Sequence, residues 1–432
     1  MKKLSITAKK IIITVLVVLL SVGTFFLGYG VREWKMNPSA AKLDDILNLI
    51  ENNYDGEFDR DKFIASAVSG SLDRFSAYFT ESEYKTNLEQ SQGIKKGKLG
   101  ISFYTGTNRI YSVEGNSPAE KAGITSGEVI GVKGKDEAEF TAVETSADFL
   151  EKYSVFELDE EFFLKIKTCD GVKEYTVKKS DYLQSFVWYQ DFSGSYGLTK
   201  TDGKWETEKL GFDLVSEVKD GYCFVRFASF YGDAETQMEA VLEKMKSNGI
   251  KKIVLDLRQN GGGYLDVLCG ITRFFCPGKP AQAVAVAQYK KGSYVFKAPL
   301  SANRYGDFGF EKIVLLMSEG TASASEALAG AILDYDEKSG KNIVKIVLSD
   351  SVSQNADGTQ TTVYRSYGKG IMQSHYKLSD GSVLKMTNAH LTWPVSGKTI
   401  HGVGITPDTD SRVVGVKSIE GKDAQAEFAM TD

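Results

Sequence analysis

The stretch that decides the fold is KIVLLMSEGTASASEALAGAIL, residues 312–333. It joins a short hydrophobic run, a loop of small and polar residues, and a longer alanine-rich run, which predicts a buried strand, a loop and a helix. The same order occurs in KKIVLDLRQNGGGYLDVLCGITRFF, residues 251–275. Strands that alternate with helices predict an α/β core built on a mixed, largely parallel sheet.

Two loops of this predicted core are candidates for the functional site, because open α/β sheets place their sites at the carboxyl ends of strands. The glycines at 261–263 lie on one such loop and Ser323 lies on the other. Ser323 and Glu326 have the S-x-x-E spacing of a capping box, which would make the serine a helix cap. A serine at a helix start can also be a nucleophile, because the helix dipole and free N–H groups favour a developing negative charge.

A nucleophilic serine needs a base. The chain has no G-x-S-x-G motif, and its histidines, His375, His390 and His401, follow Ser323 without an obvious aspartate partner, so a Ser-His-Asp triad has weak support. A lysine can replace histidine if an apolar pocket lowers its pKa from about 10.4 to about 7–8, which costs about 4 kcal/mol. Lys369, in YGKGIMQ (367–373), has such surroundings, and Gln373 four residues later could hold its amine.

Composition limits the functions available to the chain. Its 432 residues with 42% hydrophobic content allow a multidomain enzyme, and the formal charge of −5 argues against a nucleic-acid partner. Four cysteines without a CxxC pair are too few for a disulfide scaffold, and the three histidines lie together near the C-terminus. We therefore expect no zinc site.

The N-terminus predicts a membrane anchor. Four lysines among the first ten residues precede IIITVLVVLLSVGTFFLGYG, residues 11–30, an uncharged run long enough to cross a bilayer as a helix. A cleaved signal peptide is the alternative, but the run is long and lacks a clear A-x-A site. The expectation is a single-pass cell-membrane protein with its remaining domains on the extracytoplasmic side.

Changes in composition along the chain predict its domains. KLDDILNLIENNY has the apolar spacing of an amphipathic helix, and the polar stretch GLTKTDGKWETEK looks like a connection. The expected parts are the lysines and anchor (1–30), a helical arm (31–93), a glycine-rich segment with alternating strands (94–180), a connection (181–208) and the α/β core (209–432).

The segment 94–180 resembles a PDZ domain of the type found in proteases, on the basis of SPAEKAGI followed by GEVIGVKGK. Such domains bind an extended peptide as an added strand and capture its terminal carboxylate with backbone N–H groups. By this resemblance, the carboxylate-binding loop is Leu99, Gly100 and Ile101. The expected partners are the C-terminal tails of proteins or peptides.

Several motifs in order resemble the carboxyl-terminal processing peptidases, also called tail-specific proteases. They are DRFSAYFTESEY, the PDZ-like segment, VLDLRQNGGG, TASASE, YGKGIMQ and LKMTNAHLTWPVSGKTIHGVGITPD. The resemblance implies a serine endopeptidase with a Ser-Lys dyad, without metal or organic cofactor; a homo-oligomer is left open. It makes Ser323 the nucleophile, Lys369 the general base and Gln373 the residue that orients the lysine. The oxyanion hole would consist of the backbone N–H groups of Gly262 and Ala324.

Three departures from the family pattern stand out. A glycine replaces the proline usual before the glycine pair of the turn, and Lys98 precedes the expected carboxylate-binding loop. Lys369 follows Ser323 by 369 − 323 = 46 positions, which is longer than usual, and an exposed hairpin between them would leave the dyad intact. The alternative function is a catalytically inactive scaffold that binds peptides through its PDZ domain. A nucleotide-binding site is weaker still, because G-x-G-x-x-G and Walker spacing are absent.

Overall fold

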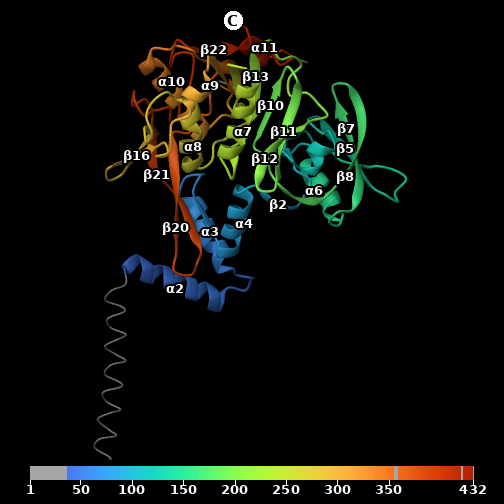
Figure 1. Cartoon of the computed structure of the whole chain (residues 1–432). Helices are drawn as coiled ribbons and strands as arrows, with labels where there is room; N and C mark the ends of the chain where they lie inside the picture. Colours follow the sequence, from blue (N-terminus) through green and yellow to red (C-terminus); the bar gives the residue numbers. More distant parts are fainter. Residues whose placement is uncertain (1–36, 355–358, 420–421, 432) are drawn as a thin grey trace, which may run out of the picture. The chain divides into compact units, whose positions relative to one another are not determined.

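The computed structural model describes residues 37–354, 359–419 and 422–431 (Figure 1). The chain divides into two compact units, Met1–Tyr78 and Phe79–Asp432, which are described separately below. The boundary falls inside the segment 31–93 that the sequence predicts as one helical arm. The structure therefore assigns the end of that arm to the second unit.

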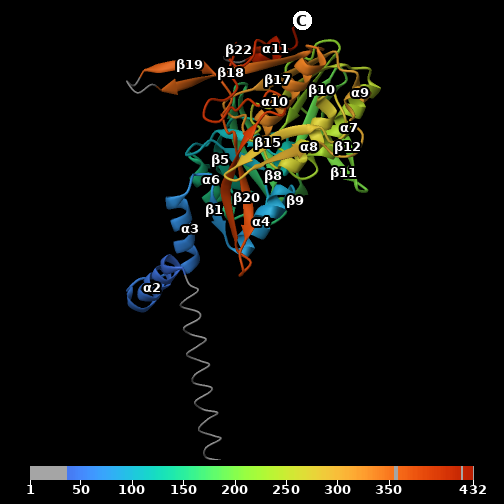
Figure 2. The ribbon, with the colours of Figure 1, turned by 90° about the vertical axis from the view of Figure 1, so that its left-hand side faces the viewer.

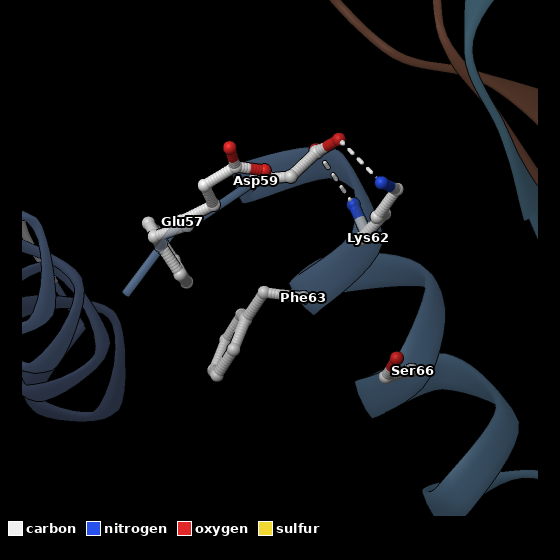
Figure 3. Close-up of a pocket in the computed structure, with 6 residues that line it drawn as sticks. Glu57, Asp59, Lys62, Phe63 and Ser66 are labelled. Atoms are coloured by element: carbon white, nitrogen blue, oxygen red, sulfur yellow. Dashed lines mark hydrogen bonds and ion pairs between the residues drawn. The ribbon is translucent and has the colours of Figure 1, made fainter. Parts of the chain in front are cut away.

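The first unit contains helices α2 (Pro38–Asn53) and α3 (Arg60–Ser71). Helix α3 begins at a side-chain cap, because the Asp59 carboxylate accepts a hydrogen bond from the Lys62 backbone N–H at 3.0 Å. The same carboxylate lies 3.7 Å from Lys62 Nζ (Figure 3). Phe63 and Ser66 line a neighbouring surface pocket of about 650 Å³. The described residues of this unit, 37–78, include no candidate catalytic group.

The membrane prediction requires correction. In the part of the chain that the structure describes, no helix combines the length and the apolar character needed to cross a bilayer. The anchor expected at residues 11–30 lies outside the described residues. This finding contradicts the expected single-pass membrane location, and we do not propose that location again.

The second unit begins with a small α/β region around residues 81–183. Strand β7 shows why it folds, because Phe162, Leu164 and Ile166 alternate along it and are all fully buried. They pack with Val129 of β5 and Phe149 of α6 in a separate hydrophobic core. The elements are α4 (Glu81–Ser91), β2 (Ile94–Lys98), β3 (Ile101–Phe103), β4 (Ile110–Val113), α5 (Pro118–Lys121), β5 (Glu128–Gly134), β6 (Thr141–Ala142), α6 (Ser146–Ser154), β7 (Glu161–Thr168), β8 (Gly171–Lys178) and β9 (Ser180–Leu183).

The larger part of the second unit is built on a mixed sheet. Its strand order is β12-β11-β10-β13-β14-β17-β18-β19, and β22 also pairs with β18. The strands are β10 (Val187–Asp191), β11 (Gly194–Thr201), β12 (Lys204–Lys209), β13 (Tyr222–Phe227), β14 (Lys252–Asp256), β17 (Lys312–Met317), β18 (Val344–Gln354), β19 (Gln360–Tyr364) and β22 (Val413–Val416). The pairs from β13 through β14 and β17 to β18, and the pair β18/β22, are parallel. The predicted mixed α/β core is confirmed, but it is parallel only in part, because the β10–β12 strands and the β18/β19 pair are antiparallel.

Helices cover both faces of this sheet, which explains the continuous hydrophobic runs of its central strands. On β14, Ile253 and Leu255 face the large core formed with α7, α8 and α10, whereas Val254 faces the core that includes α11. The helices are α7 (Ala234–Ser247), α8 (Leu265–Phe275), α9 (Tyr305–Phe308), α10 (Ala324–Ser339) and α11 (Ala424–Ala429) (Figure 1).

The structure differs from the connection predicted at 181–208. This segment contains β10, which is buried at every residue, and the hairpin of β11 and β12. Asp202 and Gly203 form its turn with φ values of 49° and 78°, the positive pair that favours a tight hairpin. The polar residues of β12 resemble a loop because the strand lies at the sheet edge, where few side chains are buried.

A second sheet contains the strand that follows the loop of the candidate base, Lys369. Strand β21 (Val383–Thr392) pairs antiparallel with both β20 (Ile371–Lys377) and β15 (Ala283–Tyr289), and β15 pairs with β16 (Ser293–Lys297). Between Ser323 and this sheet, β18 and β19 form an antiparallel hairpin that projects from the main sheet (Figure 2). The long interval between Ser323 and Lys369 thus contains a hairpin, the arrangement that the sequence left open.

Candidate active site

Ser323 lies between β17 and α10 with φ 59° and ψ −117°. A positive φ is uncommon for a residue with a side chain and costs of order 1–3 kcal/mol, so the surrounding contacts must enforce it. Two neighbouring hydroxyls supply such contacts. Thr321 donates to the Leu257 carbonyl at 2.8 Å, and Ser325 donates to the Asn260 carbonyl at 2.9 Å. These two side chains attach the serine loop to the loop that follows β14.

The glycine turn packs directly against Ser323. A Cβ added to Gly262, whose φ is 100°, would lie 2.8 Å from the Ala322 carbonyl oxygen and 2.9 Å from both Ala324 N and Ser323 Cβ. Only glycine fits there without moving backbone. The sequence-predicted residues Ser323, Ala324 and Gly262 are therefore neighbours.

The two predicted oxyanion donors differ in their present partners. The Gly262 N–H donates to Asn260 Oδ1 at 2.9 Å. Ala324 is the first residue of α10, where a backbone N–H has no intrahelical acceptor. The Ala324 N–H is thus available by position, whereas the Gly262 N–H must be shared with or released by Asn260.

Glu326 connects the serine to the lysine loop. Its Oε2 accepts hydrogen bonds from the backbone N–H groups of Ser323 and Lys369, each at 2.9 Å. Its Oε1 accepts from the Gly368 N–H at 2.7 Å and from the Ser366 hydroxyl. The sequence predicted Glu326 only as part of a capping box; the bonds to residues 366–369 could not be read from local spacing.

The Glu326 carboxyl is fully buried. Burial raises its pKa above the ordinary value, while the hydrogen bonds from Ser366, Gly368, Lys369 and Ser323 act in the opposite direction. A buried carboxylate needs hydrogen-bond donors at both of its oxygens, and these four groups provide them.

Lys369 lies at the end of a chain of side-chain hydrogen bonds. Its Nζ donates to Gln373 Oε1 at 3.0 Å, and Gln373 Nε2 donates to Thr387 Oγ1 at 3.0 Å. Gln373 on β20 and Thr387 on β21 are directly paired across the strands. Thr387 fixes the orientation of the Gln373 amide, and the sequence offered no signal for it.

The residues expected to bind a peptide carboxylate lie together between β2 and β3. Leu99 and Gly100 are buried, and Ile101 is half-buried at the start of β3. Gly100 has φ 86°, and a Cβ there would lie 2.3 Å from Ser117 Cβ. This position therefore requires glycine.

A cavity of about 1290 Å³ extends between this region and the core sheet. Tyr111 and Glu120 line it from one side, and Arg258, Gln259 and Gly320 line it from the other. Gln259 Nε2 donates across to the Tyr111 carbonyl at 3.1 Å. Gln259 precedes Asn260 in the chain, so the cavity reaches the loop that carries the glycine turn.

A serine at a helix start and a glycine turn packed against it are features that a serine-type hydrolase can use for its nucleophile and its oxyanion donors. Residues 221–340 and 354–411 match the model of peptidase family S41. These two segments are therefore similar to peptidase family S41. This similarity agrees with the class expected from the sequence motifs, a serine-type peptidase of the carboxyl-terminal processing kind.

Two relatives illustrate the similarity. A probable CtpA-like serine protease of Staphylococcus aureus strain COL is 27% identical over 376 residues, covering 85% of this chain and 64% of the relative. One from Staphylococcus saprophyticus is 26% identical over 411 residues, covering 92% and 72%. The chain thus matches less than two thirds of the length of the Staphylococcus aureus relative.

Two solved structures are also similar. A photosystem II D1 C-terminal processing protease has a TM-score of 0.46 and 19% identity, covering 89% of this chain and 90% of that one. A putative S41 protease from Bacteroides fragilis has a TM-score of 0.49 and 14% identity, covering 86% and 85%.

Proposed function

We propose that this protein is an endopeptidase that cleaves protein substrates near their C-termini through a Ser323–Lys369 dyad. The observation that carries the proposal is the buried Glu326 carboxylate, which accepts hydrogen bonds from the backbone N–H groups of both Ser323 and Lys369. One side chain thus holds the two loops in register. This arrangement favours catalysis over a helix cap alone, because a cap needs no bond to the lysine loop.

The proposed reaction is acyl transfer. Neutral Lys369 removes the Ser323 hydroxyl proton as the serine oxygen attacks the peptide carbonyl carbon, and Gln373 holds the lysine amine in position. The N–H groups of Ala324 and Gly262 stabilise the oxyanion. Lys369 then protonates the leaving amine, the C–N bond breaks, and water hydrolyses the resulting acyl-enzyme.

Substrate selection is assigned to the region around Leu99, Gly100 and Ile101, which we propose to be a PDZ domain that binds a free C-terminal carboxylate. The buried Gly100, with its positive φ, gives the compact backbone turn that such a loop needs. The cavity between this region and the core offers a path for an extended peptide.

The decisive experiment compares Lys369→Arg with wild type in hydrolysis of an unstructured protein substrate such as casein. Arginine keeps the positive charge but cannot act as a base near neutral pH, so turnover should fall to the level of Ser323→Ala. A fluorophosphonate probe should label wild type and fail to label Ser323→Ala.

Matched controls are the single replacements of His375, His390 and His401 by alanine, which should leave substantial turnover. Circular dichroism would verify that each variant is folded. Near-normal activity of Lys369→Arg, or loss of activity in one folded histidine variant, would refute the dyad.

A further inference from the structure

Two histidines that have no role in the proposed catalytic reaction lie side by side. The rings of His390, on β21, and His401, in the turn after Ile400, have centroids 5.2 Å apart and an interplanar angle of 72°. Both residues are exposed, so a small ion can reach them from solvent. Among the described residues, neither imidazole has a hydrogen bond or an ion pair.

This separation matches the distance between two imidazoles on one tetrahedral metal ion. A Zn–N distance of about 2.0–2.1 Å places each ring centroid about 3.2 Å from the ion. At a tetrahedral angle of about 109°, the two centroids are then about 5.2 Å apart. The spacing of the two rings therefore suits two ligands of one ion.

The surroundings of the two histidines include one further polar side chain. Gln288 on β15 is directly paired with His390 and exposed, so its amide lies on the same face of the sheet. Within the described residues, no group of three or more histidine, cysteine, aspartate or glutamate side chains could hold a metal ion. Water must therefore complete the coordination of an ion at this pair.

Each histidine adjoins a backbone hydrogen bond to the lysine loop. The Leu391 N–H, next to His390, donates to the Gly370 carbonyl at 2.9 Å, and the Gly402 N–H, next to His401, donates to the Gly368 carbonyl at 2.9 Å. Gly368 and Gly370 flank Lys369. A link between the two histidines would therefore fasten both sides of this loop.

We propose that His390 and His401 form a binding site for a late first-row divalent transition metal ion such as Zn²⁺, with water as the remaining ligands. Imidazole nitrogen suits zinc, copper and nickel better than magnesium or calcium. Bound metal stabilises the hydrogen bonds that hold the loop of Lys369. The site stands on the ring geometry and is independent of the proposed proteolysis.

The test is a Zn²⁺ titration by isothermal titration calorimetry on the full chain without a polyhistidine tag. All proteins carry Ser323→Ala to prevent self-cleavage and Cys169→Ser to remove the exposed free thiol, whereas the other three cysteines are buried. One ion should bind per chain. His390→Ala and His401→Ala should each weaken binding by about tenfold or more, since even loss of an outer-shell partner costs about that much.

His375→Ala is the matched control, because this third histidine packs against Tyr84 at a ring distance of 5.4 Å and should leave Zn²⁺ affinity unchanged. Zn²⁺ should also slow hydrogen exchange of the Leu391 and Gly402 amides, and His401→Gln should lose this effect. Absence of binding up to about 1 mM Zn²⁺ would overturn the proposal. So would equal affinity in the parent and both histidine variants.

Discussion

At the scale of single residues, the site depends on backbone positions more than on side-chain types. Ser323 adopts a positive φ that its neighbours impose, and Gly262 occupies a place where no other residue fits. Glu326 joins these positions to Lys369. A serine or a glycine therefore contributes to the site only where the backbone around it has the required conformation.

Glu326→Gln tests the connection between the two loops. A glutamine presents one oxygen and one NH₂ group, so the NH₂ would face N–H donors that the carboxylate now satisfies. Each lost bond costs about 1–3 kcal/mol, so we expect destabilisation of about 2–5 kcal/mol by urea unfolding and a large loss of turnover. Glu319→Gln is the control, because Glu319 forms a surface ion pair with Arg365 that contributes about 0–1 kcal/mol. Equal effects of the two substitutions would argue against the connection.

Gly262→Ala tests the contact between the glycine turn and the serine. The added Cβ would meet backbone atoms at 2.8–2.9 Å, so the turn must move away from Ser323 and Ala324. Loss of one oxyanion donor lowers kcat by about 10²–10³, and we expect a loss at least as large in a steady-state assay. Gly261→Ala is the control, since a Cβ there meets nothing within 4 Å. A normal kcat for Gly262→Ala would remove this turn from the mechanism.

At the scale of elements, the β18–β19 hairpin explains the long interval between Ser323 and Lys369. Its cross-strand pairs run from Asp350↔Tyr364 outward to Gln354↔Gln360, beyond the sheet that β18 enters (Figure 2). Val352 is 64% exposed, so the outer part buries little apolar surface. The extra residues thus lengthen the chain without separating the two loops of the site.

Replacement of residues 352–362 by Asn-Gly tests this interpretation. Ser351 and Val363 are directly paired, and Asn-Gly favours the tight turn that can join them. We expect stability within about 1 kcal/mol of wild type in urea unfolding, because a loop-length change has a small entropic cost. Turnover should be retained. Asp350→Ala is the contrasting variant, because Asp350 accepts from the Ser418 N–H at 2.8 Å and holds the base of the hairpin. A shortened protein that folds but is inactive would give the hairpin a direct catalytic role.

At the scale of the whole second unit, a buried carboxyl joins the proposed PDZ domain to the core. Glu120 of α5 accepts a hydrogen bond from the indole N–H of Trp188 on β10, and from the Asn116 N–H at 2.6 Å. Burial raises the pKa of Glu120 above its ordinary value, although the bonds from Trp188 and Asn116 oppose the rise. We therefore expect the stability of the contact between the two regions to depend on pH.

A pH series on wild type and Glu120→Gln measures this sensitivity. The folded protein binds the Glu120 proton more tightly than the unfolded chain, so this group contributes stability at low pH that is lost as pH rises through the folded pKa. From about pH 4 upward, wild type should lose free energy of unfolding relative to Glu120→Gln. Glu128→Gln, on the neighbouring β5, is the control for a carboxyl that is not fully buried. Parallel pH profiles for wild type and Glu120→Gln would show that the carboxyl does not titrate on unfolding.

The sequence by itself predicted the α/β core and the motifs to which the proposed chemistry is assigned. Hydrophobic runs bounded by turn residues predicted β14 and β17, and small residues predicted the loops that hold Gly262 and Ser323. These features depend on local spacing, and local spacing is sufficient to find them. A hairpin before Lys369 was an arrangement that the sequence left open, because an insertion into a surface connection disturbs little.

Only the tertiary structure decided which distant groups meet. Glu326 contacts the Lys369 loop, Thr387 holds Gln373, and His390 faces His401, although nothing near any of these residues in the chain predicts its partner. The segment 181–208 was predicted as a connection because the polar residues of its edge strand, β12, resemble a loop. Pairing across strands and burial of a carboxylate depend on residues that folding brings together, so local sequence patterns do not encode them.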